Sequence, residues 1–169
     1  MALFVPPEYY QGAEPIIFLA GPINGSARWQ NQALDYITNA RDKTNIASPR
    51  YIGEDQEAVG DWARGLSRTQ QIDWESFHLK KAEENGVILF WLANEHTHNC
   101  QYPYSQTTRF ELGEWTQKHL SNGAKLVVGI DTEFPGKSYI TYRIKSDFPN
   151  MPLESTLEAT CAAAIGLIS

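Results

Sequence analysis

Val87-Ile88-Leu89-Phe90-Trp91-Leu92-Ala93 is an unbroken apolar segment that follows a glycine and precedes a polar stretch. A segment of this length without alternation predicts a β-strand that is buried on both faces, as in a parallel sheet covered by helices. Residues 15–20 (PIIFLA) have the same character and end at Gly21-Pro22, which predicts a second buried strand followed by a turn. Both segments favour an α/β fold.

Segments with helical periodicity alternate with these strands along the chain. The expected helices are residues 26–40 with Ser26 as the cap, residues 70–84, a helix that begins near residue 105, and residues 157–168. The other expected strands are residues 45–48, residues 125–130 and a fifth strand at residues 139–144. This order predicts an open parallel sheet of about five strands, flavodoxin- or Rossmann-like, with helices on both faces.

Length and composition predict one domain. The 169 residues are 42% hydrophobic and 20% charged, which is typical of a globular chain with a sizeable core. Pro6-Pro7 disfavours a helix near the start of the chain. We therefore expect residues 1–14 to form an extended N-terminal arm and residues 15–169 to form a single α/β domain.

The charge balance bounds the kind of partner. The formal net charge is -6, which argues against a duplex nucleic-acid partner, because such surfaces need clustered cations to neutralise phosphates. No segment reaches the ~18 apolar residues needed to span a bilayer, so we expect no membrane partner. The two cysteines do not form a disulfide framework, which indicates a reducing compartment, and we expect a cytoplasmic protein.

Three polar segments follow predicted strands. They are residues 21–26, residues 94–105 and residues 131–138. Ligands of open parallel sheets bind at the carboxyl ends of the strands, so we expect these segments to converge on a site.

Ser105-Gln106-Thr107-Thr108-Arg109-Phe110-Glu111-Leu112-Gly113 places a carboxylate near the start of a helix. The helix N-terminus would hold Glu111 ionised, since unpaired N–H groups and the macrodipole favour negative charge there. Gly113 lacks a Cβ, so a substrate could approach closely on that side. Glu111 is therefore a candidate nucleophile. The alternative is a first-turn glutamate that only complements the dipole.

Asp73-Trp74-Glu75 supplies a second group of carboxylates, near the start of the helix at residues 70–84. If that helix opens toward the same sheet edge, Glu75 or Asp73 could face Glu111. Cleavage of a glycosidic bond commonly uses such a pair, in which one carboxylate is the nucleophile and the other carries a proton. The alternative is a solvated acidic helix face.

The remaining polar segments point to a small ligand rather than to a cofactor or a metal. The turn at Gly21-Pro22 has neither a dinucleotide fingerprint nor a phosphate loop, but it could let a sugar or base lie against the backbone, with Asn24 as a polar contact. Trp62, in a polar loop, is a candidate to stack on a base. His96, His98 and Cys100 match no usual zinc spacing, so we expect no metal.

Three ordered segments carry a family likeness. They are Ile17-Phe18-Leu19-Ala20-Gly21-Pro22-Ile23, then Trp74-Glu75 leading into residues 87–91, and then Arg109-Phe110-Glu111-Leu112-Gly113. Together they resemble the nucleoside 2-deoxyribosyltransferase-like superfamily, which also includes nucleotide N-hydrolases. The likeness spans roughly residues 15–130.

The resemblance implies that Glu111 is the nucleophile that attacks C1′ of the sugar and that Glu75 contacts the base and assists its departure. Double displacement through a glycosyl-enzyme retains the anomeric configuration, and water or a second base resolves the intermediate. No cofactor is needed. Family members often complete each site with a neighbouring subunit, so the resemblance implies a homo-oligomer with shared active sites, in which Lys137 and Ser138 could grip a phosphate.

Two departures from the family pattern refine this expectation. Several transferases carry a tyrosine that hydrogen-bonds the nucleophile, whereas this chain has Phe18, so another group must orient Glu111. Transferases often have an aspartate six residues before the nucleophile, whereas Ser105 stands here, as in the nucleotide hydrolases. A hydroxyl can donate to a 5′-phosphate that an aspartate would repel, which favours a nucleoside 5′-monophosphate as substrate.

The sequence thus predicts an N-glycosidic transferase or hydrolase with a nucleoside or nucleotide substrate. The predicted catalytic residues are Glu111 and Glu75. The predicted substrate-binding residues are Gly21, Pro22, Asn24, Trp62, Asp73, Ser105, Arg109, Lys137 and Ser138. The alternative is a catalytically silent nucleotide-binding or sensing module of the same fold, which the loss of the tyrosine favours.

Overall fold

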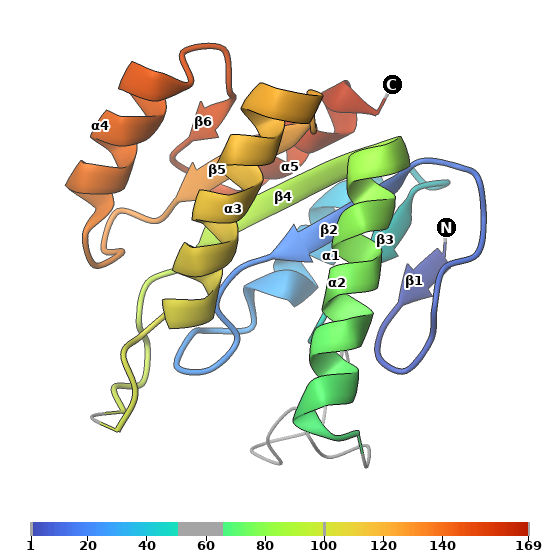
Figure 1. The fold of residues 1–169 in the computed structure, drawn as a ribbon, viewed down its shortest axis with the longest axis horizontal. Helices are drawn as coiled ribbons and strands as arrows, with labels where there is room; N and C mark the ends of the chain where they lie inside the picture. The colour runs from blue at the N-terminus through green and yellow to red at the C-terminus, as the bar shows by residue number, and fades with distance from the viewer. Residues whose placement is uncertain (1, 51–65, 100, 169) are drawn as a thin grey trace.

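The computed structural model describes residues 2–50, 66–99 and 101–168 (Figure 1). Within these ranges the strands are β1 (Ala2–Phe4), β2 (Ile16–Ala20), β3 (Asn45–Ala47), β4 (Gly86–Leu92), β5 (Leu126–Ile130) and β6 (Leu153–Glu154). The helices are α1 (Trp29–Ala40), α2 (Arg68–Asn85), α3 (Gln106–Asn122), α4 (Lys137–Asp147) and α5 (Leu157–Leu167). The strands form one open sheet in the order β1-β3-β2-β4-β5-β6, and every pair is parallel. The predicted α/β fold is confirmed, with six described strands instead of about five.

The sheet is covered on both faces. Figure 1 shows α2 and α3 in front of the sheet and α1 and α5 behind it. Every residue of β2 and β4 is buried, because alternate side chains enter two different cores. Phe18 and Phe90 belong to the core with α2, α3 and α4, whereas Leu19 and Leu89 belong to the core with α1 and α5. The strands therefore lack the alternation of a half-exposed sheet.

The predicted strand at residues 139–144 is wrong. These residues lie in α4, and the strand that pairs with β5 is β6, further along the chain. Ile144 is buried, and Ile140 is partly buried against the same core, so the inner face follows the four-residue spacing of a helix. Tyr139 and Tyr142 are exposed. In so short a segment, aromatic and β-branched residues favour a strand by propensity, and packing overrides that preference.

The predicted cap of the first helix is also wrong. Helix α1 begins at Trp29, and Arg28 occupies the cap position without a side-chain hydrogen bond to the helix. The Ser26 hydroxyl instead lies 2.7 Å from the carbonyl oxygen of Pro22 and 3.1 Å from that of Ile23. Ser26 therefore closes the turn after β2. None of the described helices combines the length and hydropathy needed to cross a bilayer.

The segment predicted as an N-terminal arm joins the sheet and then crosses to α2. Its first residues form β1, which pairs with β3. The Trp74 indole donates to the Glu8 carbonyl at 2.6 Å, and the Tyr10 N–H donates to Nε2 of His78 at 3.1 Å. Nδ1 of His78 lies 2.9 Å from the Trp74 carbonyl and donates to it. Both ring nitrogens are thus engaged, and the bonds require the neutral imidazole.

His78 makes the attachment of the arm depend on pH. Burial lowers the pKa of His78 below its ordinary value, although the bond to the Trp74 carbonyl opposes this shift. A group whose pKa is lowered on folding resists protonation in the folded state. Its contribution to the free energy of unfolding is complete above the ordinary pKa of about 6.5 and is lost as the pH falls below it.

We predict that His78→Leu lowers the free energy of unfolding by about 1–3 kcal/mol near pH 8, because the Tyr10 N–H loses its acceptor. The difference in the free energy of unfolding between wild type and variant should narrow as the pH falls below about 6.5 toward 5, because the unfolded wild type then takes up a proton on His78 that the folded protein resists. Urea unfolding of both proteins across this range measures the difference. A difference in the free energy of unfolding that does not change with pH would contradict the proposal that neutral His78 accepts a hydrogen bond from the Tyr10 N–H.

Candidate active site

The loops at the carboxyl ends of β2 and β4 lie against each other. The carbonyl of Gly25 accepts hydrogen bonds from the N–H groups of His96 and Thr97, at 2.6 and 3.0 Å. The Tyr104 hydroxyl lies 2.7 Å from the Ala93 carbonyl, which ties the end of this loop back to β4. A Cβ on Gly25 would also lie 3.3 Å from the Tyr104 ring. These contacts confirm that the two predicted polar segments converge at one edge of the sheet.

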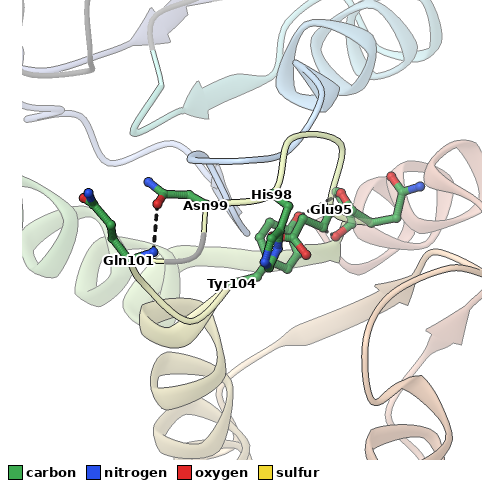
Figure 2. A network of polar contacts seen from close by, with 7 residues as sticks. Glu95, His98, Asn99, Gln101 and Tyr104 are labelled. Carbon is green, nitrogen blue, oxygen red and sulfur yellow. Dashed lines mark hydrogen bonds and ion pairs between the residues drawn. The ribbon is translucent and has the colours of Figure 1, made fainter.

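The loop between β4 and α3 is braced by its own polar side chains. Figure 2 shows Glu95, His98 and Tyr104 gathered together, whereas Asn99 and Gln101 pair further along the loop. Nδ1 of His98 lies 2.9 Å from Oε1 of Glu95, and the Gln101 N–H donates to Oδ1 of Asn99 at 2.9 Å. The structure therefore gives His98 a carboxylate partner within its own loop.

Glu111 lies in the second turn of α3, on the same face as the buried residues Thr108, Leu112 and Trp115. It is half-buried. The predicted effect of the helix N-terminus is wrong, because the dipole acts mainly within the first turn. Burial, and after it the negative charges of Glu75 and Glu114, raise the pKa of Glu111 to about 8. Glu111 thus holds a proton near neutral pH.

Glu75 comes from α2 and is close enough to act on Glu111, as the raised pKa of Glu111 shows. The two helices cover the same face of the sheet, and this brings together the two predicted catalytic carboxyl groups. Nε2 of Gln71 donates to Oε1 of Glu75 at 2.8 Å. Among the residues that the structure describes, no donor contacts the carboxyl group of Glu111. The two carboxyl groups therefore have different surroundings, as a proton donor and an acceptor require.

Two residues of the sequence hypothesis lie away from this pair. Asp73 is exposed on α2, two residues from Glu75 and thus on nearly the opposite side of the helix. Gly113 is exposed on α3, and a Cβ there would meet nothing within 4 Å. The structure therefore does not bring Asp73 to Glu111, and the lack of a Cβ at Gly113 opens no approach to the pair.

The turn after β2 has a structural reason for its glycine. A Cβ on Gly21 would lie 2.4 Å from the Trp91 carbonyl and 2.6 Å from the Trp29 ring. The Pro22 carbonyl accepts from the Trp29 indole at 2.9 Å, so this turn packs tightly on β4 and α1. Asn24 is exposed at its tip. Trp62, the predicted base contact, lies outside the described residues.

Ser105 has the most unusual backbone of the site. It precedes α3 at the cap position with φ of 59° and ψ of 26°, the left-handed region that residues other than glycine rarely adopt. Its Oγ is buried and makes no hydrogen bond within the described part of the chain. A strained residue with an unpaired buried hydroxyl is a feature that recurs at ligand sites.

The predicted cations lie at the next loop. The Arg109 guanidinium donates to the Pro135 carbonyl at 2.5 Å and lies 4.6 Å from the centre of the Phe134 ring. Arg109 therefore fastens the start of α3 to the loop between β5 and α4. Lys137 and Ser138 are the first residues of α4, and Ser138 is exposed.

Sequence reasoning missed Gln71 and Tyr104. Gln71 stands four residues before Glu75, and this spacing on a helix predicts a side-chain contact. Tyr104 gave no such signal, because its hydroxyl contacts backbone carbonyls that only the folded loop brings near.

Among known proteins, no family model matches the chain and no curated protein matches it. A functional assignment therefore depends on the residues of the site and on their geometry.

Because the pKa of Glu111 is raised, we expect the free energy of unfolding to depend on pH. Because the folded state holds this proton more tightly than the unfolded chain, the free energy of unfolding falls as the pH rises from about 4.5 to about 8. Glu111→Gln removes the ionisable group, so we expect its Tm to exceed that of the wild type by about 2–4 °C near pH 8 and to match it near pH 4. Calorimetry at both pH values measures the difference.

The matched control is Glu84→Gln on α2, because Glu84 is not among the groups that raise the pKa of Glu111. Glu84 is exposed and pairs with Lys81 at 3.4 Å, so its replacement removes a surface ion pair and should not raise the Tm. An equal rise in both variants would mean that general charge reduction, rather than the burial of Glu111, causes the effect.

Proposed function

We propose that the protein cleaves the N-glycosidic bond of a nucleoside or, preferably, of a nucleoside 5′-monophosphate. The observation that carries the proposal is the pair of interacting carboxyl groups, Glu111 on α3 and Glu75 on α2, over one face of the sheet. Carboxyl pairs with unequal surroundings are the usual means of cleaving a glycosidic bond. Their elements begin next to the strand ends where α/β sheets bind small ligands.

The protonation of the pair suggests the sequence of events. Glu111 holds a proton in the free protein, and this proton passes to the nucleobase, directly or through Glu75, when the substrate is bound. The Glu111 carboxylate then forms a bond to C1′ as the bond from C1′ to the base nitrogen breaks, and the base leaves with the proton. Water or a second base attacks C1′ and releases Glu111, giving retention of configuration overall.

Ser105 supports a phosphorylated substrate. Its buried Oγ has no partner within the described residues, and it stands at the N-terminus of α3, where backbone N–H groups favour an anion. We propose that this hydroxyl donates to the 5′-phosphate. Lys137 and Ser138 begin α4, next to the loop that Arg109 fastens to α3, and they are the further candidates for phosphate contacts.

A homo-oligomer with shared sites is part of the proposal. Tyr139 and Tyr142 are 67% and 70% exposed on α4, which follows the third loop of the site. Exposed aromatic side chains are enriched at protein interfaces. A second copy packed on α4 would cover both rings and lie next to Lys137. We further propose that the enzyme is cytoplasmic and uses no cofactor.

We predict that the protein releases free base from deoxynucleoside 5′-monophosphates and that Glu111→Ala lowers the rate by at least about 10³-fold, since the nucleophile is lost. Glu84→Gln is the control, because this exposed carboxylate on α2 does not act on Glu111 and should leave the rate within about twofold of wild type. Chromatography of the base, with nucleosides and nucleotides and with and without an acceptor base, measures both variants.

The assay distinguishes the remaining possibilities. Base release without an acceptor indicates a hydrolase, and exchange without net release indicates a transferase. Absence of turnover together with equal nucleotide binding by wild type and Glu111→Ala would support a silent nucleotide-binding or sensing module. The lack of a donor to Glu111 among the described residues is the observation that favours that second function.

Two variants separate the proposed contact of the Ser105 hydroxyl with the 5′-phosphate from the backbone strain at this residue. Ser105→Gly relieves the left-handed conformation and should raise the free energy of unfolding by about 1 kcal/mol, whereas Ser105→Ala should not. Both variants lose the hydroxyl, so both should lower kcat/KM for the 5′-monophosphate by about 10- to 100-fold and leave the nucleoside unaffected. Equal losses on both substrates would show that Ser105 does not recognise the phosphate.

A further inference from the structure

Gln71 connects the sheet to one of the two carboxyl groups. It lies on α2, four residues before Glu75, and only 7% of its surface is exposed. Its Nε2 donates to the Pro49 carbonyl at 3.2 Å and to Oε1 of Glu75 at 2.8 Å. A buried amide that bridges a backbone carbonyl and a carboxylate has its N–H groups fully used, one on each acceptor.

The orientation of this amide is fixed by its partners. The Pro49 carbonyl and Oε1 of Glu75 are placed as acceptors, so rotation of the carboxamide by 180° would set oxygen against oxygen. Pro49 is itself held close to the sheet, because the buried Ser48 before it donates its N–H to the Phe4 carbonyl at 2.9 Å. The Glu75 carboxyl group is therefore held in place relative to the sheet, through Gln71 and Pro49, as well as by its own helix α2.

We infer that Gln71 is a positioning residue for the proposed cleavage: its amide holds the Glu75 carboxyl group in the orientation from which it acts on Glu111 and the base. This inference rests on the proposed function. Gln71 itself touches no substrate and acts through the Glu75 carboxyl group that its amide contacts.

The opposing explanation is that Gln71 only ties α2 to the end of β3. In that case its loss would weaken the fold but would not change proton transfer. The two explanations differ in the pH dependence of turnover, because an N–H donor favours the charged form of a carboxyl group.

The test compares Gln71→Met, which keeps the length of the side chain without a donor, with Gln71→Lys, which keeps N–H donors at a similar reach. We expect Gln71→Met to lower kcat by about 10- to 100-fold with little change in KM and to move the acid limb of the pH profile to higher pH. Gln71→Lys should restore much of kcat and move that limb to lower pH. Gln117→Met, at an exposed glutamine of α3, is the matched control and should behave as wild type.

The outcomes separate the inference from the function on which it rests. Turnover by the wild type with an unchanged kcat and pH profile in Gln71→Met overturns the inference and leaves the proposed function standing. Equal losses in the Met and Lys variants, accompanied by a lower Tm, also overturn it. Absence of turnover in the wild type overturns the proposed function. Carboxyl carbon resonances of Glu75, titrated by NMR, then test the amide contact directly, and an identical titration in wild type and Gln71→Met overturns it.

Discussion

The burial of β2 and β4 on both faces is the constraint from which the rest of the structure follows. Two uninterrupted apolar strands cannot leave either side to water, so helices must cover the sheet in front and behind. Parallel neighbours then require a connection that returns to the starting edge of the sheet, which places the polar loops together at the other edge. The carboxyl pair of α2 and α3 lies where it does because both helices must cover the same face.

The sequence was sufficient for the parts that depend on local pattern. Of the predicted strand at residues 87–93, residues 87–92 lie in β4, because every side chain is apolar whichever face it takes. The helix expected from residue 70 begins at Arg68, two residues earlier, behind a capping box formed by Ser67 and Gln70. The strand prediction for residues 139–144 failed because a segment of six residues with two tyrosines and two isoleucines fits both the helical and the strand periodicity. The helix is selected by tertiary packing, in which Ile144 enters the core.

The candidate site was predictable in its residues but not in their chemical state. Glu111 and Glu75 could be singled out from their positions along the chain, yet the protonation of Glu111 depends on burial and on a neighbour 36 residues away. The helix N-terminus does not offset this effect of burial, because α3 begins at Gln106 and Glu111 therefore lies beyond the first turn, where the dipole mainly acts. The left-handed backbone of Ser105 likewise follows from how the loop enters α3, which no short sequence pattern specifies.

The register of the central strands has a further consequence for how the molecule assembles. Ile16 of β2 pairs with Gly86 of β4, so the middle of the sheet joins residues 70 positions apart. The chain loses the entropy of closing this loop before the strand pairing can stabilise it. Such non-local pairing raises the contact order and slows folding. Until β4 pairs with β2, one edge of β2 has unpaired backbone N–H and C=O groups. During this stage of folding the chain is most prone to aggregate by pairing with strands of other molecules.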